Sequence, residues 1–314
     1  MTAALVRRWL EAGELDLPAP GSGRTGSRWW KLAAMAENDV VAGRLAEAHA
    51  DALAILAELR GPAPATGQLW GVWAAEAPQC VVTVREDDDG AAVLDGTKAW
   101  CSGAGICTHA LITARRDDNA RGIYAVDLSQ DGVAASPSDW HNVGMRDSDT
   151  RAVQLNGAIG VPVGLPGEYL TRSGFWHGAM GVAACWLGGA RAVAAPLYRA
   201  VADGHEGGST DVHTHAHLGA VDAALAAAEA MLVSAACFVD AEPQSARSEL
   251  VARRVRAVVE RAVDEAIVRT GRALGPAPLV LDGRHAQRVA DLTIYVRQSH
   301  AERDLAALGK AAAR

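Results

Sequence analysis

The sequence predicts an α+β protein with a short N-terminal helical segment, a middle domain that is an antiparallel β-barrel or sandwich, and a C-terminal four-helix bundle. Residues 69–163 contain short β-branched runs separated by turn signals at regular spacing, which is typical of an antiparallel barrel or sandwich. After Gly167 the sequence has long amphipathic stretches separated by Gly and Pro, which is typical of an up-down bundle. We place the three parts at residues 1–64, 65–165 and 166–314.

The N-terminal part predicts a short first helix, a Pro/Gly/Ser linker up to residue 26, and then two helices. The two helices start at Ser27, an N-cap candidate, meet near Asn38-Asp39 and end at Gly61-Pro62. The bundle is expected in four stretches, at residues 173–204, 211–241, 246–274 and 283–308. The breaks between them fall at residues 203–208, 242–243 and 275–278.

Composition excludes several classes of partner. The formal net charge is −7 and no basic stripe follows the chain, so nucleic acid is not expected to bind. The five cysteines form no C-x-x-C pair, which favours a reducing compartment. No apolar run approaches a bilayer span, and the N-terminus lacks a signal pattern, so we expect a cytoplasmic protein without a membrane partner.

The stretch 93–114 combines a turn signal, a large ring and bare backbone. Asp95-Gly96 predicts a hairpin turn, because glycine adopts positive φ without penalty. The run Gly103 to Gly105 leaves little side chain above the backbone, so a flat molecule could approach closely. Alternate residues would lie on one face of a strand: Lys98, Trp100 and Ser102. The stretch therefore predicts a seat for a planar ligand.

This stretch resembles the middle β-domain of the acyl-CoA dehydrogenases, which carries a pattern like L-x-G-x-K-x-W-[IC]-[ST]. The matching residues are Leu94, Gly96, Lys98, Trp100, Cys101 and Ser102, followed by Gly103. The resemblance implies that Trp100 packs against the isoalloxazine ring of FAD and that the Ser102 hydroxyl bonds the flavin near N5. From the residues alone, a hairpin with an inward Trp and a turn Ser is the alternative.

Two further segments carry the resemblance. The segment from Trp140 to Pro162 is similar to the family's G-M-R-x-S-x-T motif and the strand that follows it. The segment Gly71–Pro78 stands where the family has a Thr-Glu-Pro loop on the pyrimidine side of the flavin, with Ala75 in place of the Thr; Trp73 would line this loop. The alternative for the G-M-R-x-S-x-T residues is a capped turn that closes the β-domain.

The catalytic Glu of the family has no counterpart at either usual position. In the family, a desolvated Glu removes the substrate's α-proton while flavin N5 takes the β-hydride. The stretch similar to I-Y-E-G-T places Val296 at the base position and Gln298 in the following pair, where it would contact the cofactor. The alternative position on the first bundle helix is occupied by Gly178.

Three interpretations follow from the missing Glu. His177, beside Phe175 and Trp176 in a potential aryl pocket, is our first candidate for an acid–base group, and His300 is our second. Flavin oxygenases on the same fold lack the Glu and use neighbouring His or Ser residues to steer oxygen chemistry. The third interpretation is a non-catalytic subunit that pairs with a catalytic one.

The family's FAD phosphate motif R-x-x-F-G is also absent, and residues 204–219 stand in its place. His213 and His217 lie four residues apart in this segment, a spacing that can present two metal ligands. Because the nearby Asp211 is an N-cap candidate and Asp222 lies beyond the next turn, we expect no metal site.

Together, the residues and the resemblance imply an FAD-dependent oxidoreductase that oxidises the CH–CH group of an acyl thioester, such as an acyl-CoA, or of a related small molecule. The resemblance also implies a homodimer or homotetramer. The alternatives are a non-catalytic partner in a heteromeric complex and a flavin-dependent monooxygenase.

Overall fold

The computed structural model describes residues 2–86, 91–116, 118, 120–207 and 211–313. The chain forms two compact units. The β-unit comprises Met1–Leu17, Leu45–His141 and Arg146–Phe175. The helical unit comprises Pro18–Arg44, Asn142–Met145 and Trp176–Arg314. These two units group the chain differently from the three domains that we expect from the sequence. The boundaries of these three domains stay a prediction.

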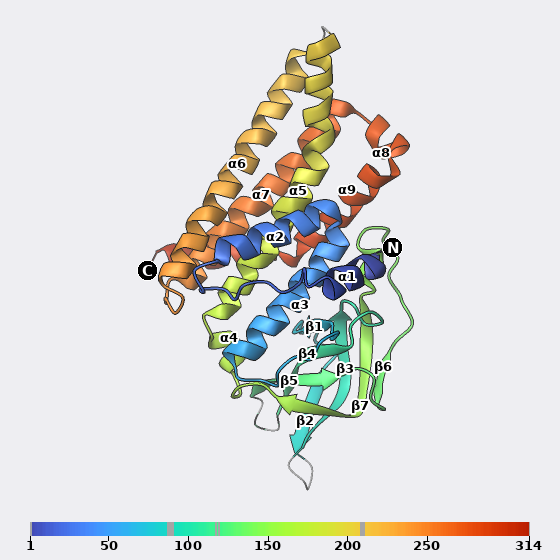
Figure 1. The fold of residues 1–314 in the computed structure, drawn as a ribbon, viewed down its shortest axis with the longest axis vertical. Coiled ribbons are helices and arrows are strands. Elements are labelled where there is room, and N and C mark those ends of the chain that lie inside the picture. The colour runs from blue at the N-terminus through green and yellow to red at the C-terminus, as the bar shows by residue number, and fades with distance from the viewer. Residues whose placement is uncertain (1, 87–90, 117, 119, 208–210, 314) are drawn as a thin grey trace. The chain divides into compact units, whose positions relative to one another are not determined.

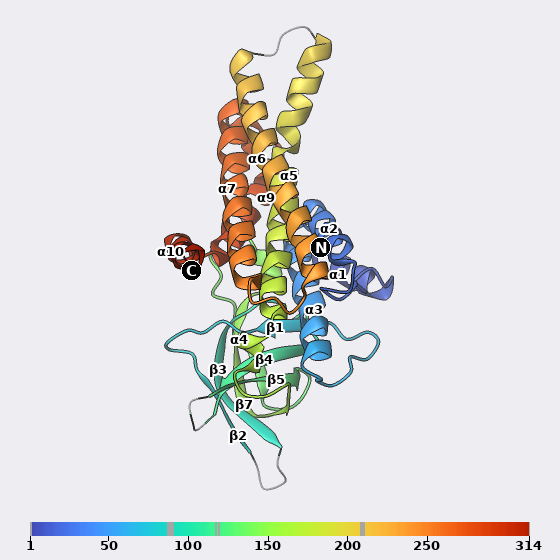
Figure 2. The same cartoon turned by 90° about the vertical axis from the view of Figure 1, so that its left-hand side faces the viewer.

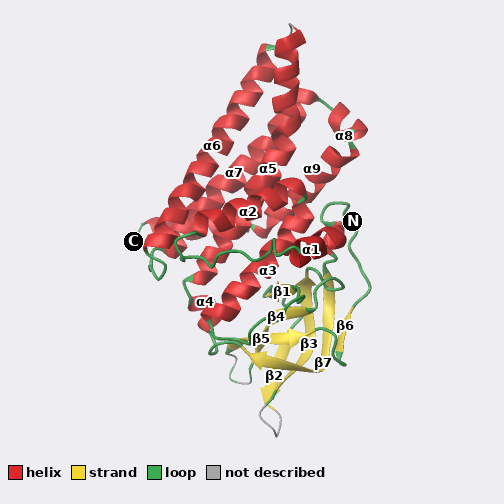
Figure 3. Cartoon of the chain, viewed as in Figure 1, coloured by secondary structure: helices red, strands yellow, loops and turns green. Residues whose placement is uncertain are grey.

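Within its described residues, the β-unit has seven strands in one sheet. Figure 3 draws these strands in yellow. The strands are β1 (Trp70–Trp73), β2 (Val82–Glu86), β3 (Ala92–Cys101), β4 (His109–Arg115), β5 (Arg121–Asp127), β6 (Val133–Ala135) and β7 (Arg151–Pro162). Its helical elements are α1 (Thr2–Glu11), the 3₁₀ turn η1 (Arg146–Ser148), α4 (Glu168–Thr171) and the C-terminal part of α3 (Val40–Glu58).

The sheet closes into the predicted barrel. Strands β4, β2, β3, β7 and β5 follow one another in hydrogen-bonded order, and β5 pairs back with β4. Most pairings are antiparallel, but β4 runs parallel to β1 and to β2. The barrel interior is filled by side chains, with Trp73, Leu94, Ile112 and Tyr124 among them. A second apolar cluster of the same unit includes Ile55 and Leu56 of α3.

The predicted hairpin at Asp95-Gly96 is wrong. Both residues lie inside β3, where the register with β7 shifts between Leu94 and Asp95. Gly96 has φ of 126°, and a Cβ there would lie 2.1 Å from the carbonyl oxygen of Val81. The dipeptide therefore marks a β-bulge with close backbone approach, a setting that requires glycine for the same reason as a tight turn.

The helical unit contains α2 (Thr25–Asn38), α6 (Val212–Ala241), α7 (Ser248–Leu274), α8 (Ala277–Leu281), α9 (Gly283–Tyr295), the 3₁₀ turn η2 (Val296–Gln298) and α10 (Glu302–Ala312), with nearly all of α5 (Gly174–Gly207) (Figure 1). Both views show α5, α6 and α7 running alongside one another (Figures 1 and 2). Trp186 of α5 packs edge to face on Tyr295 of α9. Helix α9 is therefore the fourth helix of the bundle in the described part of the chain. The predicted helical bundle is confirmed.

Several predicted helix ends are confirmed and two shift. The break at Asn38-Asp39 separates α2 from α3, and the Asp39 carboxylate accepts a hydrogen bond from the backbone N of Ala42. The first of the two helices begins at Thr25 rather than Ser27, because Asp240 accepts hydrogen bonds from both the backbone N and the hydroxyl of Thr25. Helix α5 extends to Gly207, past the predicted break, and Gly208 lies outside the described residues.

The fourth predicted bundle stretch, at 283–308, is interrupted. The chain leaves the helix after η2, and Ala301 has φ of 47°. At the break, the Ser299 hydroxyl donates to Glu260 of α7 at 2.5 Å and accepts from the backbone N of Ala301. Because the partner that stabilises this break comes from another helix, no Gly or Pro is needed to mark it.

Among the described residues, two helices are long and apolar enough to cross a membrane by length and composition alone. Of the most apolar 18-residue window in each helix, 78% is buried in α5, as in the core helix of a soluble protein, and 33% is buried in α6. The absence of a membrane partner stays a prediction.

Candidate functional site

Two loops of the β-unit are held together where the sequence resembles the flavin seat. The turn after β3 donates two backbone hydrogen bonds to the G-M-R-x-S-x-T segment, from Gly103 N to Ser148 O at 2.8 Å and from Ala104 N to Asp149 O at 3.1 Å. The Asp149 carboxylate accepts from Gly105 N at 2.7 Å and pairs with Arg151. The predicted capped turn is thus present, and it also fixes the Ser102 turn.

Three hydroxyl groups form a chain across this junction. The Ser102 Oγ lies 2.9 Å from Thr150 Oγ1, which lies 2.7 Å from Ser148 Oγ. Ser102 is half-buried, whereas Ser148 is 1% exposed. The three hydroxyl groups therefore lead from the buried Ser148 to the half-buried Ser102.

Trp100, two residues before Ser102, is exposed to solvent. Its indole is 62% exposed and packs edge to face against Trp140, with ring centroids 6.3 Å apart. Its φ is 60°, a conformation that non-glycine residues adopt at a cost and that is concentrated at functional sites. An exposed indole is a surface on which a planar ligand can stack.

The expectation that Lys98, Trp100 and Ser102 share one face is wrong. The pairing of β3 with β7 is irregular between Lys98 and Cys101, which breaks the two-residue alternation. As a result Lys98 is buried at 2% exposure while Trp100 points outward.

The expectation of bare backbone at residues 103–105 is also wrong. A Cβ at Gly103 would meet the Cys107 sulfur at 2.7 Å, and a Cβ at Gly105 would meet the Asp149 carboxylate at 2.7 Å. These glycines make room for the protein's own side chains, so the exposed part of the site is the Trp100 indole with the Ser102 hydroxyl.

Trp73 lies beneath this site in the barrel core. It is 2% exposed, and its indole Nε1 donates to the backbone carbonyl of Ser102 at 3.0 Å. Any contribution of Trp73 to a ligand site therefore passes through the position of Ser102. Its role in cofactor binding stays a prediction.

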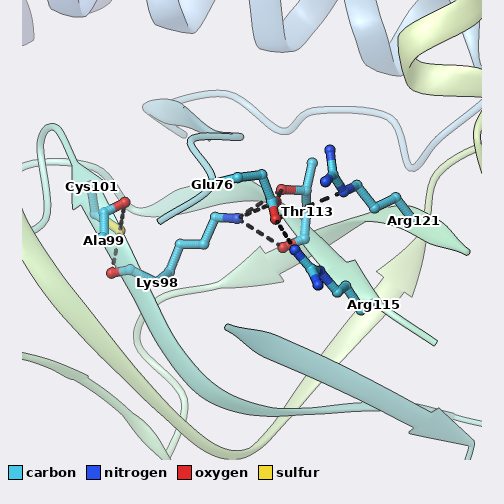
Figure 4. A network of polar contacts seen from close by, with 7 residues as sticks. All are labelled: Glu76, Lys98, Ala99, Cys101, Thr113, Arg115 and Arg121. Carbon is cyan, nitrogen blue, oxygen red and sulfur yellow. Dashed lines mark hydrogen bonds and ion pairs between the residues drawn. The ribbon is translucent and has the colours of Figure 1, made fainter. Parts of the chain in front are cut away.

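A charged network that sequence reasoning missed anchors the loop after β1 (Figure 4). Buried Lys98 lies 3.4 Å from the Glu76 carboxylate and donates to the carbonyl and hydroxyl of Thr113 at 3.0 and 2.7 Å. The same carboxylate pairs with Arg115 at 3.2 Å and Arg121 at 3.7 Å. Glu76 therefore ties its loop to β3, β4 and β5. Arg115 and Arg121 are single charges at strand ends and carry no sequence signal for this network, because the contacts depend on barrel closure.

Burial and charge act against each other in this network. Burial acts to raise the pKa of Glu76, but the positive charges of Lys98 and Arg121 and the hydrogen bond from Arg115 outweigh it, so that pKa lies below its ordinary value. Burial also lowers the pKa of Lys98, and the Glu76 charge opposes this effect. Burial raises the pKa of the Cys101 thiol, so Cys101 stays protonated at neutral pH.

His177 lies in the helical unit, near the start of α5, and is 4% exposed. Its two aromatic neighbours have contacts of their own: Phe175 packs on Tyr169, and Trp176 lies against the guanidinium of Arg253. The aryl pocket around His177 stays a prediction.

Gln298 and His300 are both exposed in the segment between α9 and α10. The His300 ring nitrogen Nδ1 lies 3.5 Å from Asp304. Arg256 of α7 donates to the carbonyl oxygens of Ala179 and Gln298, and thereby holds the α5 turn that follows His177 next to the Gln298 backbone. The roles of His177, His300 and Gln298 stay predictions.

The two positions aligned with the family's base hold no carboxylate. Val296 is fully buried in η2, and Gly178 lies in α5. The sequence has no Asp or Glu from residue 169 to residue 202 or from 292 to 301. Proton abstraction by a carboxylate at these positions is therefore impossible.

In the described part of the chain, no group of three or more His, Cys, Asp or Glu side chains is placed to hold a metal ion. His213, His215 and His217 lie in the first turns of α6, and His215 Nδ1 lies 3.2 Å from the Asp211 carbonyl oxygen. The contact gives this histidine a local role at the helix start.

Comparison with known proteins supports the resemblance. Residues 75–158 match the family model described as acyl-CoA dehydrogenase, middle domain. Butyryl-CoA dehydrogenase from Megasphaera elsdenii has a similar structure, with a TM-score of 0.76 over 90% of this chain and 81% of that one, at 16% identity. The chain is acyl-CoA dehydrogenase-like in its middle domain and its fold. A search of curated protein sequences finds no significant match.

Two similar structures of this acyl-CoA dehydrogenase-like fold contain FMN. TdsC from Paenibacillus sp. A11-2, in complex with FMN and indole, gives a TM-score of 0.77 at 18% identity, over 98% of this chain and 94% of that one. KijD3, in complex with FMN and a dTDP-linked amino keto sugar, gives a TM-score of 0.83 at 18% identity, over 98% of this chain and 85% of that one. TdsC is described as a dibenzothiophene monooxygenase.

Proposed function

We propose that this chain is a flavin-dependent oxidoreductase of the oxygenating type, acting on a small organic molecule. The observation that carries the proposal is a retained Trp100–Ser102 turn combined with Val296 and Gly178 at the base positions. Dehydrogenation of an acyl thioester needs a base for a weak carbon acid, whereas oxygen transfer does not. The likeness to a described monooxygenase supports the same choice.

The residues of the β-unit fit a flavin ring. The exposed Trp100 indole offers a stacking surface, and the half-buried Ser102 hydroxyl follows two residues later, with its backbone carbonyl held by Trp73. The absence of R-x-x-F-G in residues 204–219 removes the family's phosphate motif for FAD. We therefore propose FMN as the sufficient cofactor, in agreement with the FMN complexes of the two similar structures.

A reduced flavin, when bound, supplies the two electrons with which one atom of O₂ enters the substrate and the other leaves as water. In this proposal Trp100 orients the ring, and the Ser102 hydroxyl forms a hydrogen bond at its edge. His300 is exposed beside Asp304, and we keep it with His177 as a proposed acid–base group.

Oxidation of an acyl thioester is the second candidate, favoured by the match of residues 75–158 to the acyl-CoA dehydrogenase middle domain. It would require a base from outside the two family positions. A non-catalytic subunit is the outcome if neither reaction occurs.

We expect the protein loaded with reduced FMN to incorporate one ¹⁸O atom from ¹⁸O₂ into indole, used as the probe substrate. Mass spectrometry of the product tests this expectation, with free reduced FMN and the Trp100→Ala variant as controls. We also expect no acyl-CoA of a short-to-long-chain series to bleach the oxidised flavin band. Bleaching by an acyl-CoA, without ¹⁸O incorporation, would favour the dehydrogenase and contradict the oxygenating proposal.

A further inference from the structure

The hydroxyl chain of Ser148, Thr150 and Ser102 has three possible hydrogen-bond arrangements. Each hydroxyl has one hydrogen to donate and two lone pairs, and both links, at 2.7 and 2.9 Å, allow either atom to be the donor. If Ser148 donates to Thr150 and Thr150 donates to Ser102, the Ser102 hydrogen is free for a ligand. In the other two arrangements Ser102 donates its hydrogen to Thr150 and offers a ligand only lone pairs.

Burial selects among the three arrangements. Ser148 is 1% exposed, and within the described ranges its hydroxyl has a single partner, the Thr150 oxygen. If Thr150 donated to Ser148, the Ser148 hydrogen would be buried without an acceptor, so Ser148 donates to Thr150. If Ser102 also donated to Thr150, the hydrogen of the half-buried Thr150 hydroxyl would have no acceptor among the described residues, so Thr150 donates to Ser102.

Hydrogen bonds around the three hydroxyl groups hold their two loops in place. The Ser148 carbonyl is held by Gly103 N, and the Asp149 carboxylate is held by Gly105 N and Arg151. These contacts fix the Ser148 loop against the Ser102 turn on both sides of the hydroxyl chain. Only the hydrogen positions remain free to change.

We propose that Ser148 and Thr150 are positioning residues that orient the Ser102 hydroxyl as a hydrogen-bond donor toward the bound ligand. The site then prefers a ligand atom that accepts a hydrogen bond at Ser102. This inference rests on the proposed flavin site: the unprotonated N5 of oxidised flavin accepts such a bond, whereas the N5–H of reduced flavin donates one. This arrangement of the three hydroxyl groups therefore favours binding of the oxidised cofactor over binding of the reduced one.

The direction can be tested without a flavin, by chemical denaturation of the single and double variants. Thr150→Val leaves the buried Ser148 hydrogen without an acceptor, and we expect the unfolding equilibrium constant to rise about tenfold. Adding Ser148→Ala removes that orphaned donor, so the double variant should regain most of the loss. Thr83→Val, at an exposed hydroxyl on β2, is the matched control and should change little. A double variant as unstable as the sum of the two single variants would overturn the proposed direction.

The consequence for the ligand is tested by redox titration of the protein loaded with FMN. Thr150→Val removes the donor that orients the Ser102 hydroxyl, so this hydroxyl can turn a lone pair toward N5–H, and reduced FMN should gain affinity about tenfold relative to oxidised FMN. This ratio corresponds to a midpoint potential about 30 mV higher for a two-electron couple. Thr150→Ser keeps the chain and should leave the potential unchanged. Bound FMN whose potential does not move in Thr150→Val, or moves equally in Thr150→Ser, would overturn the inference.

Failure of the proposed function gives a different result. A wild-type protein that binds no flavin refutes the flavin site and the predicted preference for its oxidised form. The denaturation experiment still decides the direction of the hydroxyl chain in that case.

Discussion

Replacing Glu76 with alanine is expected to destabilise the protein by about 3 kcal/mol, because a buried ammonium group loses its counter-charge. Lys98 is 2% exposed and would keep only the two oxygens of Thr113. Removing one member of a buried ion pair costs far more than the pair itself contributes. Urea denaturation monitored by tryptophan fluorescence measures the change.

Two comparisons make this expectation specific to the buried charge. Lys98→Met should cost about 1 kcal/mol, because Glu76 keeps Arg115 and Arg121, and the double variant should be more stable than Glu76→Ala alone. Glu249→Ala removes a carboxylate from a partly exposed i,i+4 pair with Arg253 and should cost less than about 0.5 kcal/mol. Equal losses in Glu76→Ala and Glu249→Ala would contradict the role of burial.

The same contact predicts a pH dependence. The pKa of Glu76 is lowered in the folded protein, so its contribution to stability is complete above its ordinary pKa of 4.5 and is lost as the pH falls through the lowered value. The stability difference between wild type and Glu76→Ala should therefore shrink below pH 4.5. If the stability difference between wild type and Glu76→Ala stayed constant as the pH falls, the role of the Glu76 charge would be contradicted.

Gly188→Ala is expected to destabilise the helical unit by about 3 kcal/mol, because helices α5 and α2 approach too closely for a methyl group. A Cβ at residue 188 would lie 2.0 Å from the carbonyl oxygen of Ala33 and 2.8 Å from its carbonyl carbon. Both are backbone atoms, so relief requires the helices to move apart. The midpoint of urea denaturation should fall with little change in slope.

Gly219→Ala provides the matched control within another helix of the same unit. A Cβ at this position of α6 meets nothing within 4 Å, so only the helix propensity changes. We expect a gain of about 0.5–1 kcal/mol. A loss in both variants, or in neither, would contradict the close packing of α5 on α2.

The sequence predicts the helices and strands well where turn and capping residues determine their ends. The turn spacing of the strands, the helix break at Asn38-Asp39 and the breaks beside Glu242 and Gly275 are local signals, and the structure confirms each. The G-M-R-x-S-x-T segment was also correctly interpreted as a turn that closes the β-domain. Its Ser148 and Thr150 are polar residues in a turn, as turn chemistry requires.

Features that depend on distant partners could not be predicted. The bulge at Asp95-Gly96 depends on the Val81 carbonyl, and the break before Ala301 depends on Glu260. Burial of Lys98 requires barrel closure, and the hydroxyl chain requires two loops about 50 residues apart to meet. In each case the local sequence is compatible with a simpler structure, and tertiary contacts override it.

The central claim, that the Trp100–Ser102 turn holds a flavin ring, is tested most directly by titrating the purified protein with FMN and recording flavin fluorescence. Stacking on Trp100 should quench the fluorescence with a saturation point near one FMN per chain. Trp100→Ala should weaken binding about 10- to 100-fold, as expected for loss of one stacking partner. Absence of saturable quenching in the wild type, or equal affinity in Trp100→Ala, would contradict the flavin site.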